Sequence, residues 1–283
     1  MNNILEVEHL CKSFPSFELQ DISFAVPEGS IMGFIGENGA GKTTTIKLIF
    51  NLLKKEKGTI NLFGKDSEDN SLKYEIGTVL SEGFFPDTME AAEIALVMQQ
   101  IYPNFDRAEY NTYCDRFQLP MKKQIKEFST GMKMKCRLAA ALVHYPRLLI
   151  LDEPTAGLDP VVRNEILDIF LEYIQNETRS IFFSTHITED IEKIADYVTF
   201  IHQGKLIFSR QKDELMSDYG ILKCSKNGLP NDCLGNVLFK RENQFGAEYL
   251  LHDRHACTAS DQVLIEPAAL DEIMLFYAKG ETI

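Results

Sequence analysis

The chain has 283 residues, a length that allows one large domain with a small appendage or two modest domains, and its 45% hydrophobic and 25% charged residues are typical of a globular protein. Its formal net charge of −13 disfavours a nucleic-acid-binding surface, because phosphate backbones attract an excess of Lys and Arg. The longest apolar run, Leu138–Val143, is far shorter than the roughly 20 residues that span a bilayer. No secretory leader is expected. The cysteines are scattered and form no CxxC pair, which favours free thiols.

The first elements in chain order are strands. Ile22, Phe24 and Val26 alternate with polar residues, which predicts a half-exposed antiparallel strand. Three short apolar runs predict strands buried on both faces: Ile31–Ile35, Leu148–Leu151 and Ile181–Phe183. Helical patterns separate these runs, so we expect an α/β fold with a mainly parallel sheet. A late hairpin is predicted over Thr199–Phe208, with its turn at Gln203-Gly204.

The predicted organisation is a large domain over residues 1–212 and a small accessory domain over residues 213–283. Between about residues 85 and 145 the pattern becomes helical, which predicts a helical insertion between two strands of the sheet. After about Arg210 the alternation of helix and strand stops. Short strand candidates and a final amphipathic helix near Ala269–Ala278 predict an α+β appendage.

A phosphate-binding loop follows the strand Ile31–Ile35. The segment Gly36–Thr43 fits the pattern G-x-x-x-x-G-K-[ST], and a helix with a regular apolar face leaves it. Glycines allow successive backbone N–H groups to face phosphate oxygens, Lys42 would reach the β- and γ-phosphates, and the Thr43 hydroxyl would bind Mg²⁺. The predicted nucleotide-binding residues are Gly36, Glu37, Asn38, Gly39, Ala40, Gly41, Lys42, Thr43 and Thr44. Kinases, GTPases and many ATPases share such a loop.

Two carboxylates follow the next buried strand. Asp152 and Glu153 come directly after Leu148–Leu151, and ligands of open α/β sheets bind at the carboxyl ends of strands. We therefore expect Asp152 to face the Mg²⁺ beside Thr43, and Glu153 to polarise the attacking water as general base. The alternative is a strand that simply ends in a solvated turn.

His186 stands at the end of a third strand, in Phe182-Phe-Ser-Thr-His186. A histidine in this position is often only a surface or capping residue. Because the other two strand ends carry the phosphate loop and the carboxylates, we expect His186 to hydrogen-bond the γ-phosphate.

The order and spacing of five motifs closely resembles the ATP-binding-cassette ATPases. The motifs are Gly36–Thr43, Phe128–Met132, Leu148–Glu153, Gly157–Asp159 and His186, and the resemblance covers about residues 3–215. Within this family the chain looks most like the ATPase subunits of bacterial exporters whose permease is a separate chain. The resemblance implies a phosphate-loop NTPase fold with an antiparallel β subdomain, ATP and Mg²⁺ as cofactors, and a transmembrane permease as partner.

The resemblance also implies a head-to-tail dimer with a second copy or a homologous ATPase subunit. Ser129 and Gly131 of one subunit would then contact the γ-phosphate held by the other. Asp159 would lie at the dimer interface, and Phe14 would stack on adenine. A core aromatic on an N-terminal strand is the alternative for Phe14.

This sequence departs from the family pattern at two places. The usual signature LSGGQ is replaced by Phe128-Ser-Thr-Gly-Met132, so Ser129 and Gly131 remain. The loop that normally carries a magnesium-contacting glutamine follows Ile76–Leu80, and here Ser81 and Glu82 stand in it. Serine is too short to replace glutamine directly, whereas Glu82 would reach the metal only if the register shifts by one. Slow hydrolysis, or a metal shell completed by water, would follow.

Two neighbouring features have open interpretations. Lys133, Lys135 and Arg137 begin the helix after the signature without an acidic neighbour in it, which indicates either a phosphate site or a solvated basic face. The pair Phe84-Phe85 either contacts the permease or packs inside the helical insertion.

The predicted function is therefore Mg²⁺-dependent ATP hydrolysis that powers a separate permease, with export more expected than import. The chain would work in the cytoplasm, at the inner face of the plasma membrane, and without a nucleic-acid partner. Two alternatives remain: a cassette ATPase of translation or DNA repair, and a weakly hydrolysing regulatory subunit of a heterodimer. A single cassette and the acidic balance disfavour the former, and Glu153 with His186 disfavours the latter.

Overall fold

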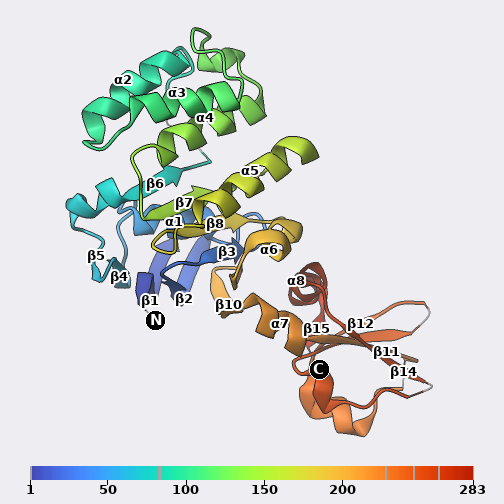
Figure 1. The fold of residues 1–283 in the computed structure, drawn as a ribbon. Coiled ribbons are helices and arrows are strands. Elements are labelled where there is room, and N and C mark those ends of the chain that lie inside the picture. Colours follow the sequence, from blue (N-terminus) through green and yellow to red (C-terminus); the bar gives the residue numbers. More distant parts are fainter. Residues whose placement is uncertain (1, 82–84, 227, 245, 261, 283) are drawn as a thin grey trace. The chain divides into compact units, whose positions relative to one another are not determined.

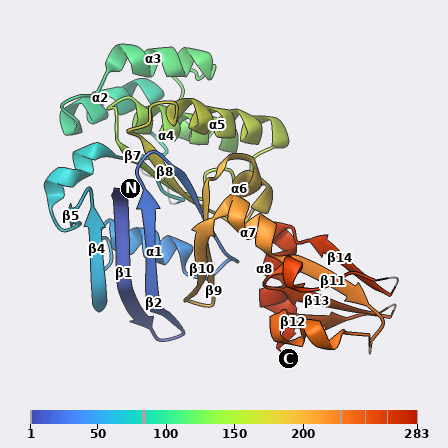
Figure 2. The same cartoon turned by 60° about the horizontal axis from the view of Figure 1, so that its bottom comes forward.

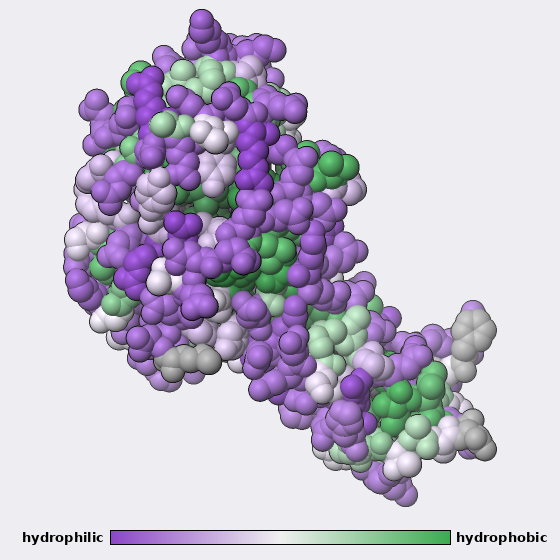
Figure 3. Space-filling model, in the orientation of Figure 1, coloured by the Kyte–Doolittle hydropathy of each residue, from purple (hydrophilic) through white to green (hydrophobic). Residues whose placement is uncertain are grey.

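The computed structural model describes residues 2–81, 85–226, 228–244, 246–260 and 262–282. The chain divides into two compact units, Met1–Ser209 and Arg210–Ile283, whereas the sequence places the boundary after residue 212. Most of the surface visible in Figure 3 is hydrophilic, with apolar residues gathered in small separate patches. Within the described part of the chain, no helix has the length and apolar character needed to cross a bilayer.

A mixed ten-stranded sheet forms the first unit (Figure 1). Its strands are β1 (Asn3–Phe14), β2 (Phe17–Pro27), β3 (Ile31–Ile35), β4 (Lys57–Leu62), β5 (Lys65–Asp66), β6 (Ile76–Val79), β7 (Leu148–Asp152), β8 (Ser180–Thr185), β9 (Tyr197–His202) and β10 (Lys205–Gln211). Their order across the sheet is β5-β4-β1-β2-β10-β9-β3-β8-β7-β6. The turn between β9 and β10 has positive φ at both Gln203 and Gly204, as a two-residue hairpin turn requires, so the predicted hairpin is confirmed.

The predicted parallel strands form the centre of this sheet. β9, β3, β8, β7 and β6 pair in parallel, and every residue of β3, β7 and β8 is buried. Helices cover both faces: α1 (Lys42–Ile49), α5 (Pro160–Tyr173) and α6 (Thr188–Ile194). Phe34 packs in one core cluster with Ile46 of α1, whereas Gly33, on the other face of β3, lies against Ile191 of α6. This double covering explains why the strands are apolar throughout.

The antiparallel part of the sheet is formed by β1, β2, β4 and β5, which lie side by side in Figure 2. Ile22, Phe24 and Val26 all lie in β2 and are buried, so the predicted antiparallel strand is confirmed. Phe24 stacks with Phe34 and Phe182, with ring centroids 5.4–5.6 Å apart. These three rings join the antiparallel part to the parallel strands that carry the site.

A group of helices lies between β6 and β7 in the sequence and forms one cluster in Figure 1. Its members are α2 (Ala91–Ile101), α3 (Arg107–Arg116), η2 (Ile125–Glu127) and α4 (Thr130–Leu142), and η1 (Asn70–Glu75) precedes β6. Asp106 caps α3 by accepting a hydrogen bond from the Glu109 amide at 3.0 Å. Tyr110 is fully buried between these helices and donates its hydroxyl to the Ala91 carbonyl.

The second unit is a five-stranded antiparallel sheet with helices. Its elements are α7 (Lys212–Asp218), β11 (Gly220–Cys224), η3 (Asn231–Asn236), β12 (Val237–Glu242), β13 (Ala247–Leu251), η4 (Arg254–Ala256), β14 (Val263–Pro267), α8 (Leu270–Lys279) and β15 (Glu281–Thr282). The strand order is β14-β11-β13-β12-β15. Leu222, Tyr249 and Leu251 form its core, so the appendage has the α+β character that the sequence predicts.

Candidate functional site

The predicted phosphate loop joins the carboxyl end of β3 to the N-terminus of α1. Gly39 and Gly41 have φ values of 84° and 115°, in the region that residues with a Cβ avoid. A Cβ on Gly36 would lie 2.4 Å from the Ile201 carbonyl oxygen, so this position has no room for a side chain. The N-terminus of α1 adds unpaired N–H groups and the positive end of the helix dipole. The loop therefore has the backbone geometry of an anion site.

A cavity of about 520 Å³ opens beside this loop. The predicted residues that line it are Glu37, Asn38, Gly39, Gly41, Lys42, Thr43, Thr44 and Glu153, together with Ser16 and Phe17. The structure brings Phe17 to the cavity, whereas Phe14, which the sequence analysis selects, lies at the end of β1 and is 38% exposed. The two rings are neighbours, with centroids 6.4 Å apart. Phe17 is thus an aromatic wall of the cavity that sequence reasoning missed.

Lys42 is the cation of this cavity. Its ammonium donates to the Gly36 carbonyl at 2.6 Å and to the Glu37 carbonyl at 3.2 Å. It also forms an ion pair with Glu153 Oε1 at 3.0 Å, and only 5% of its side chain is exposed. Because Glu153 Oε1 has no hydrogen bond of good geometry among the described residues, this contact is a charge pair rather than a well-aligned bond. The loop therefore holds its ammonium group next to a carboxylate.

Asp152 is the centre of a hydrogen-bond cluster at the ends of three strands. Its buried carboxylate accepts from the Thr43 hydroxyl at 2.8 Å and the Ser81 hydroxyl at 2.7 Å, both on Oδ2, and from the Ser184 hydroxyl at 2.6 Å on Oδ1. Thr43, Ser81 and Asp152 thus present hard oxygen atoms around one point, the type of ligand that Mg²⁺ prefers. Mg²⁺ characteristically takes few protein ligands and completes its shell with phosphates and water. The donor set fits that ion.

Glu153 lies at the bend that follows β7. Its φ is +51°, a strained value for a residue with a side chain, and its amide donates to the Ser184 carbonyl at 3.1 Å and the Ser184 hydroxyl at 3.0 Å. His186 Nδ1 is hydrogen-bonded to Glu153 Oε2 at 2.8 Å. The structure therefore brings together the three predicted residues Lys42, Glu153 and His186. Glu153 Oε1 faces the ammonium of Lys42, and Glu153 Oε2 faces the ring of His186.

The predicted signature residues lie elsewhere, outside the cavity lining. Ser129 is exposed and caps α4 by accepting from the Met132 amide at 3.2 Å. A Cβ on Gly131 would be 3.0 Å from Val162. Asp159 is exposed and caps α5 by accepting from the amides of Val161 and Val162 at 3.1 Å. The side chains of Ser129 and Asp159 therefore have a local capping role within the single chain.

The basic residues of α4 have carboxylate neighbours that the sequence did not reveal. Lys133 lies 3.5 Å from Asp87, and Lys135 lies 2.5 Å from Glu165. The helix itself supplies no carboxylate to either lysine, as the sequence shows, and tertiary packing supplies them from other segments. Arg137 has no carboxylate within ion-pair distance among the residues that the structure describes.

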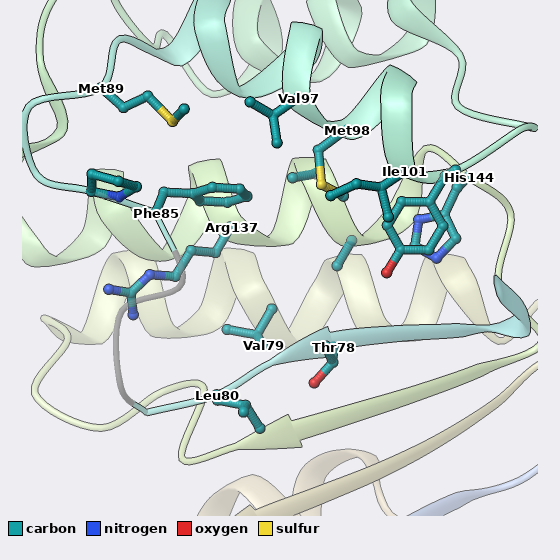
Figure 4. Close-up of a pocket in the computed structure, with 14 residues that line it drawn as sticks. Thr78, Val79, Leu80, Phe85, Met89, Val97, Met98, Ile101, Arg137 and His144 are labelled. Atoms are coloured by element: carbon teal, nitrogen blue, oxygen red, sulfur yellow. The ribbon is translucent and has the colours of Figure 1, made fainter. Parts of the chain in front are cut away.

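A second pocket, of about 260 Å³, lies between β6 and the helices α2 and α4 (Figure 4). Its wall is mostly apolar and consists of Thr78, Val79, Leu80, Phe85, Pro86, Met89, Val97, Met98, Ile101, Tyr102, Arg137, Ala140, Ala141 and His144. His144 is 3% exposed, its ring stacks on Tyr102 at 3.9 Å, and its Nε2 donates to the Ile76 carbonyl at 3.3 Å. Burial lowers the pKa of His144. Its Nδ1 is buried and has no hydrogen-bond partner of good geometry among the described residues.

Comparison with known proteins identifies the family. A family profile described as "ABC transporter" matches residues 19–156. The chain is 36% identical over 212 residues to the bacitracin transport ATP-binding protein BcrA of Bacillus licheniformis, covering 73% of this chain and 69% of the relative. The chain belongs to the ATP-binding subunits of ABC transporters.

Other members of the ABC family support the assignment. The ABC transporter ATP-binding protein YtrB of Bacillus subtilis is 30% identical over 218 residues, which cover 76% of this chain and 75% of YtrB. The lantibiotic transport ATP-binding protein SrtF of Streptococcus pyogenes is 31% identical over 219 residues, which cover 74% of this chain and 92% of SrtF. A solved ATP-binding subunit of an ABC transporter superimposes with a TM-score of 0.67 at 28% identity, covering 75% of this chain and 91% of that one.

Membership of the ABC family confirms three expectations. The fold is that of a phosphate-loop NTPase, the bound nucleotide is ATP, and the chain is an ATPase. The resemblance drawn from the five sequence motifs is therefore correct.

Sequence reasoning missed three residues of this ABC site, Ser16, Phe17 and Ser184, and named one that the structure does not describe. Ser184 is part of the Asp152 cluster, and its only sequence signal is a polar residue in an otherwise apolar strand end, two positions before His186. Phe17 has no sequence signal that separates it from Phe14. Glu82, the alternative metal ligand, lies outside the described residues.

Proposed function

We propose that this ABC subunit supplies a separate transmembrane permease with energy from ATP hydrolysis and that the complex works as an exporter. Support comes from the relatives BcrA and SrtF, whose names describe bacitracin transport and lantibiotic transport. In such a complex the chain would bind the permease at the inner face of the plasma membrane. The observation that carries the catalytic part of the proposal is Glu153, held between Lys42 and His186 beside the Asp152 cluster.

The roles of the cavity residues follow from their chemistry. The N–H groups of residues 36–44 would hold the phosphates, and Lys42 would balance the charge of the β- and γ-phosphates. Glu153 Oε2 would accept a proton from the attacking water, with His186 hydrogen-bonded to the same carboxylate and positioned near the γ-phosphate. Phe17 and Phe14 offer aromatic faces to the adenine.

Thr43, Ser81 and Asp152 are the proposed magnesium ligands. When bound, Mg²⁺ would neutralise charge on the phosphate oxygens. Asp152 supplies the single carboxylate, Thr43 and Ser81 supply hydroxyl oxygens, and Ser184 holds the opposite oxygen of Asp152 in place. Ser81 has a shorter side chain than the glutamine usual at this loop, but its hydroxyl already lies beside Asp152 and would join the magnesium coordination shell from there.

A head-to-tail dimer is the proposed assembly. Ser129, Gly131 and Asp159 lie outside the cavity lining of their own chain, and Ser129 and Asp159 are exposed. Val161, beside Asp159, is 69% exposed, which is high for a large apolar side chain. A second ATPase subunit would cover these residues and bring its own Ser129 and Gly131 to the γ-phosphate.

The second pocket is the proposed permease-docking site. It has an apolar, partly enclosed wall beside Phe85, and Ile101 at its rim is 49% exposed. Apolar grooves of this kind accept the apolar face of a short helix.

Replacing Glu153 by Gln tests the catalytic assignment. The variant removes the base and the negative charge next to Lys42, so ATP binding should be retained or tightened while hydrolysis falls by at least about 100-fold. We expect an ATP-dependent dimer, measured by size-exclusion chromatography with light scattering. Glu177→Gln, a change at an exposed glutamate, is the matched control and should hydrolyse ATP at the wild-type rate. Unchanged turnover of Glu153→Gln would refute the general-base role.

A further inference from the structure

Arg137 differs from the other basic residues of α4. Lys133 and Lys135 each have a carboxylate partner, whereas Arg137 has none among the described residues. Arg137 instead extends from α4 along the second pocket, beside the ring of Phe85 (Figure 4). A guanidinium is well matched by a carboxylate that accepts two of its N–H donors at once. An acidic side chain on a docked segment would supply such a carboxylate.

The rest of the pocket describes the partner further. Met89, Val97 and Met98 give it an apolar wall, and the flexible methionine side chains can adapt to the shape of an inserted side chain. Its volume of about 260 Å³ suits a few side chains rather than a large ligand, since ligand pockets typically hold about 300–1,000 Å³. An apolar anchor on a short helix fits such a wall.

His144 marks the opposite end of the same pocket from Arg137 in Figure 4. The ring is 3% exposed and its Nδ1 is buried, so His144 closes this end of the pocket without an accessible polar atom. The pocket therefore has a cation at one end, the stacked rings of His144 and Tyr102 at the other, and an apolar wall between them. These ends are different, so they can distinguish the two directions of a docked segment.

We propose that Arg137 selects the permease by binding an Asp or Glu on the cytoplasmic segment that docks in this pocket. This rests on the proposed function, namely that the chain drives a separate permease. The apolar residues of that segment fill the space against Met98 and Val97, and its acidic side chain forms a forked pair with Arg137. Since the ATPase carries a net charge of −13, it would repel a long acidic segment. A single carboxylate at Arg137 would therefore make binding specific for the right permease and would not speed the encounter of the two proteins.

Site-specific photo-cross-linking in the full-length chain tests this inference. A benzophenone amino acid at Ile101 should cross-link, in cells that make the native complex, to a cytoplasmic loop of a multi-span membrane protein. Mass spectrometry of the linked peptide should show an Asp or Glu next to apolar residues. Arg137→Glu should reduce the amount of that protein that co-purifies by about 10-fold or more, and exchanging its acidic residue for Arg should restore it.

Arg107→Glu is the matched control, because it makes the same charge change at an exposed position of the helical cluster outside the pocket. Arg137→Gln removes the charge without reversing it and should also reduce co-purification of the membrane protein. Its thermal midpoint shows whether that loss comes from the missing ion pair or from impaired folding. If Ile101 cross-links to no membrane protein, the proposed transport function fails together with this inference. If it cross-links to a permease loop without an acidic residue, or the charge exchange does not restore binding, only the role of Arg137 fails.

Discussion

Replacing Ser184 by Ala removes one hydroxyl that contacts both the carboxylate of Asp152, a proposed magnesium ligand, and the backbone amide of Glu153, the proposed base. Ser184 Oγ donates to Asp152 Oδ1 at 2.6 Å and accepts from the Glu153 amide at 3.0 Å, and the residue is fully buried. The variant should therefore lose stability and also lose control over the position of Asp152 Oδ2, the oxygen that faces Thr43 and Ser81. Ser184 is a positioning residue, since it acts through Asp152.

The size of both effects can be worked from these contacts. A hydrogen bond to a charged group contributes about 1.5–3 kcal/mol. For a domain of this size, each kcal/mol lowers the thermal midpoint by about 2–4 °C, so Ser184→Ala should melt roughly 3–12 °C below wild type. Loss of a residue that orients a metal ligand typically weakens metal affinity or activity by about 10–100-fold. We expect a comparable rise in the Mg²⁺ concentration for half-maximal ATP hydrolysis.

Ser180→Ala is the control, because Ser180 lies on the same strand, is equally buried, and accepts a neutral hydrogen bond from the Gly29 amide at 2.9 Å. It should lower the thermal midpoint and leave the Mg²⁺ dependence unchanged. The assays are phosphate release at graded Mg²⁺ and differential scanning fluorimetry. If Ser184→Ala and Ser180→Ala show the same Mg²⁺ dependence as wild type, Ser184 has only a structural role and the reasoning is refuted.

Two further predictions concern the loop and the second pocket. Gly36→Ala should abolish ATP binding, measured by equilibrium dialysis, because the added Cβ would lie 2.4 Å from the Ile201 carbonyl oxygen. Gly39→Ala is the control: its Cβ would meet nothing within 4 Å, and the φ of 84° should cost only about 1–2 kcal/mol of backbone strain. Equal losses of ATP binding in both variants would contradict the steric explanation. Burial lowers the pKa of His144 below its ordinary value near 6.5, so the unfolded chain binds the proton more readily. The stability that the neutral ring contributes is complete above pH 6.5 and is lost as the pH falls. Urea unfolding at pH 5–7.5 should show that the free energy of unfolding falls less at low pH for His144→Phe than for wild type. If it depends on pH identically in the two proteins, burial of neutral His144 is not the cause.

The sheet and the phosphate loop could be predicted because their signals are local. Ile31–Ile35 is apolar throughout, and β3 has those same bounds. Glycine at positions 39 and 41 permits the positive φ that the loop adopts, and that freedom belongs to the residue itself. The strand ends at Asp152 and His186 could be assigned to one edge because parallel strands end on the same side of a sheet.

Contacts between segments could not be predicted in the same way. Lys133 and Lys135 pair with Asp87 and Glu165, which are remote in the sequence, so the helix alone showed only excess positive charge. Phe17 and Phe14 are equivalent aromatic residues in the sequence, and only the bend between β1 and β2 decides that Phe17 reaches the cavity. The role of Ser81 is similar, since its hydroxyl is too short to suggest a ligand until the structure places it 2.7 Å from Asp152.

The sequence by itself determined that the chain has a phosphate loop, strand-end carboxylates and the ordered motifs of an ABC ATPase. These features depend on residue type and spacing along the chain, where steric freedom, apolar runs and strand direction act over a few residues. Only the tertiary structure decided that Ser81, Ser184 and Thr43 share the carboxylate of Asp152, and that Arg137 and His144 stand at opposite ends of one pocket. Such convergence depends on the register and packing of strands and helices that are far apart in the chain, and no local pattern records it.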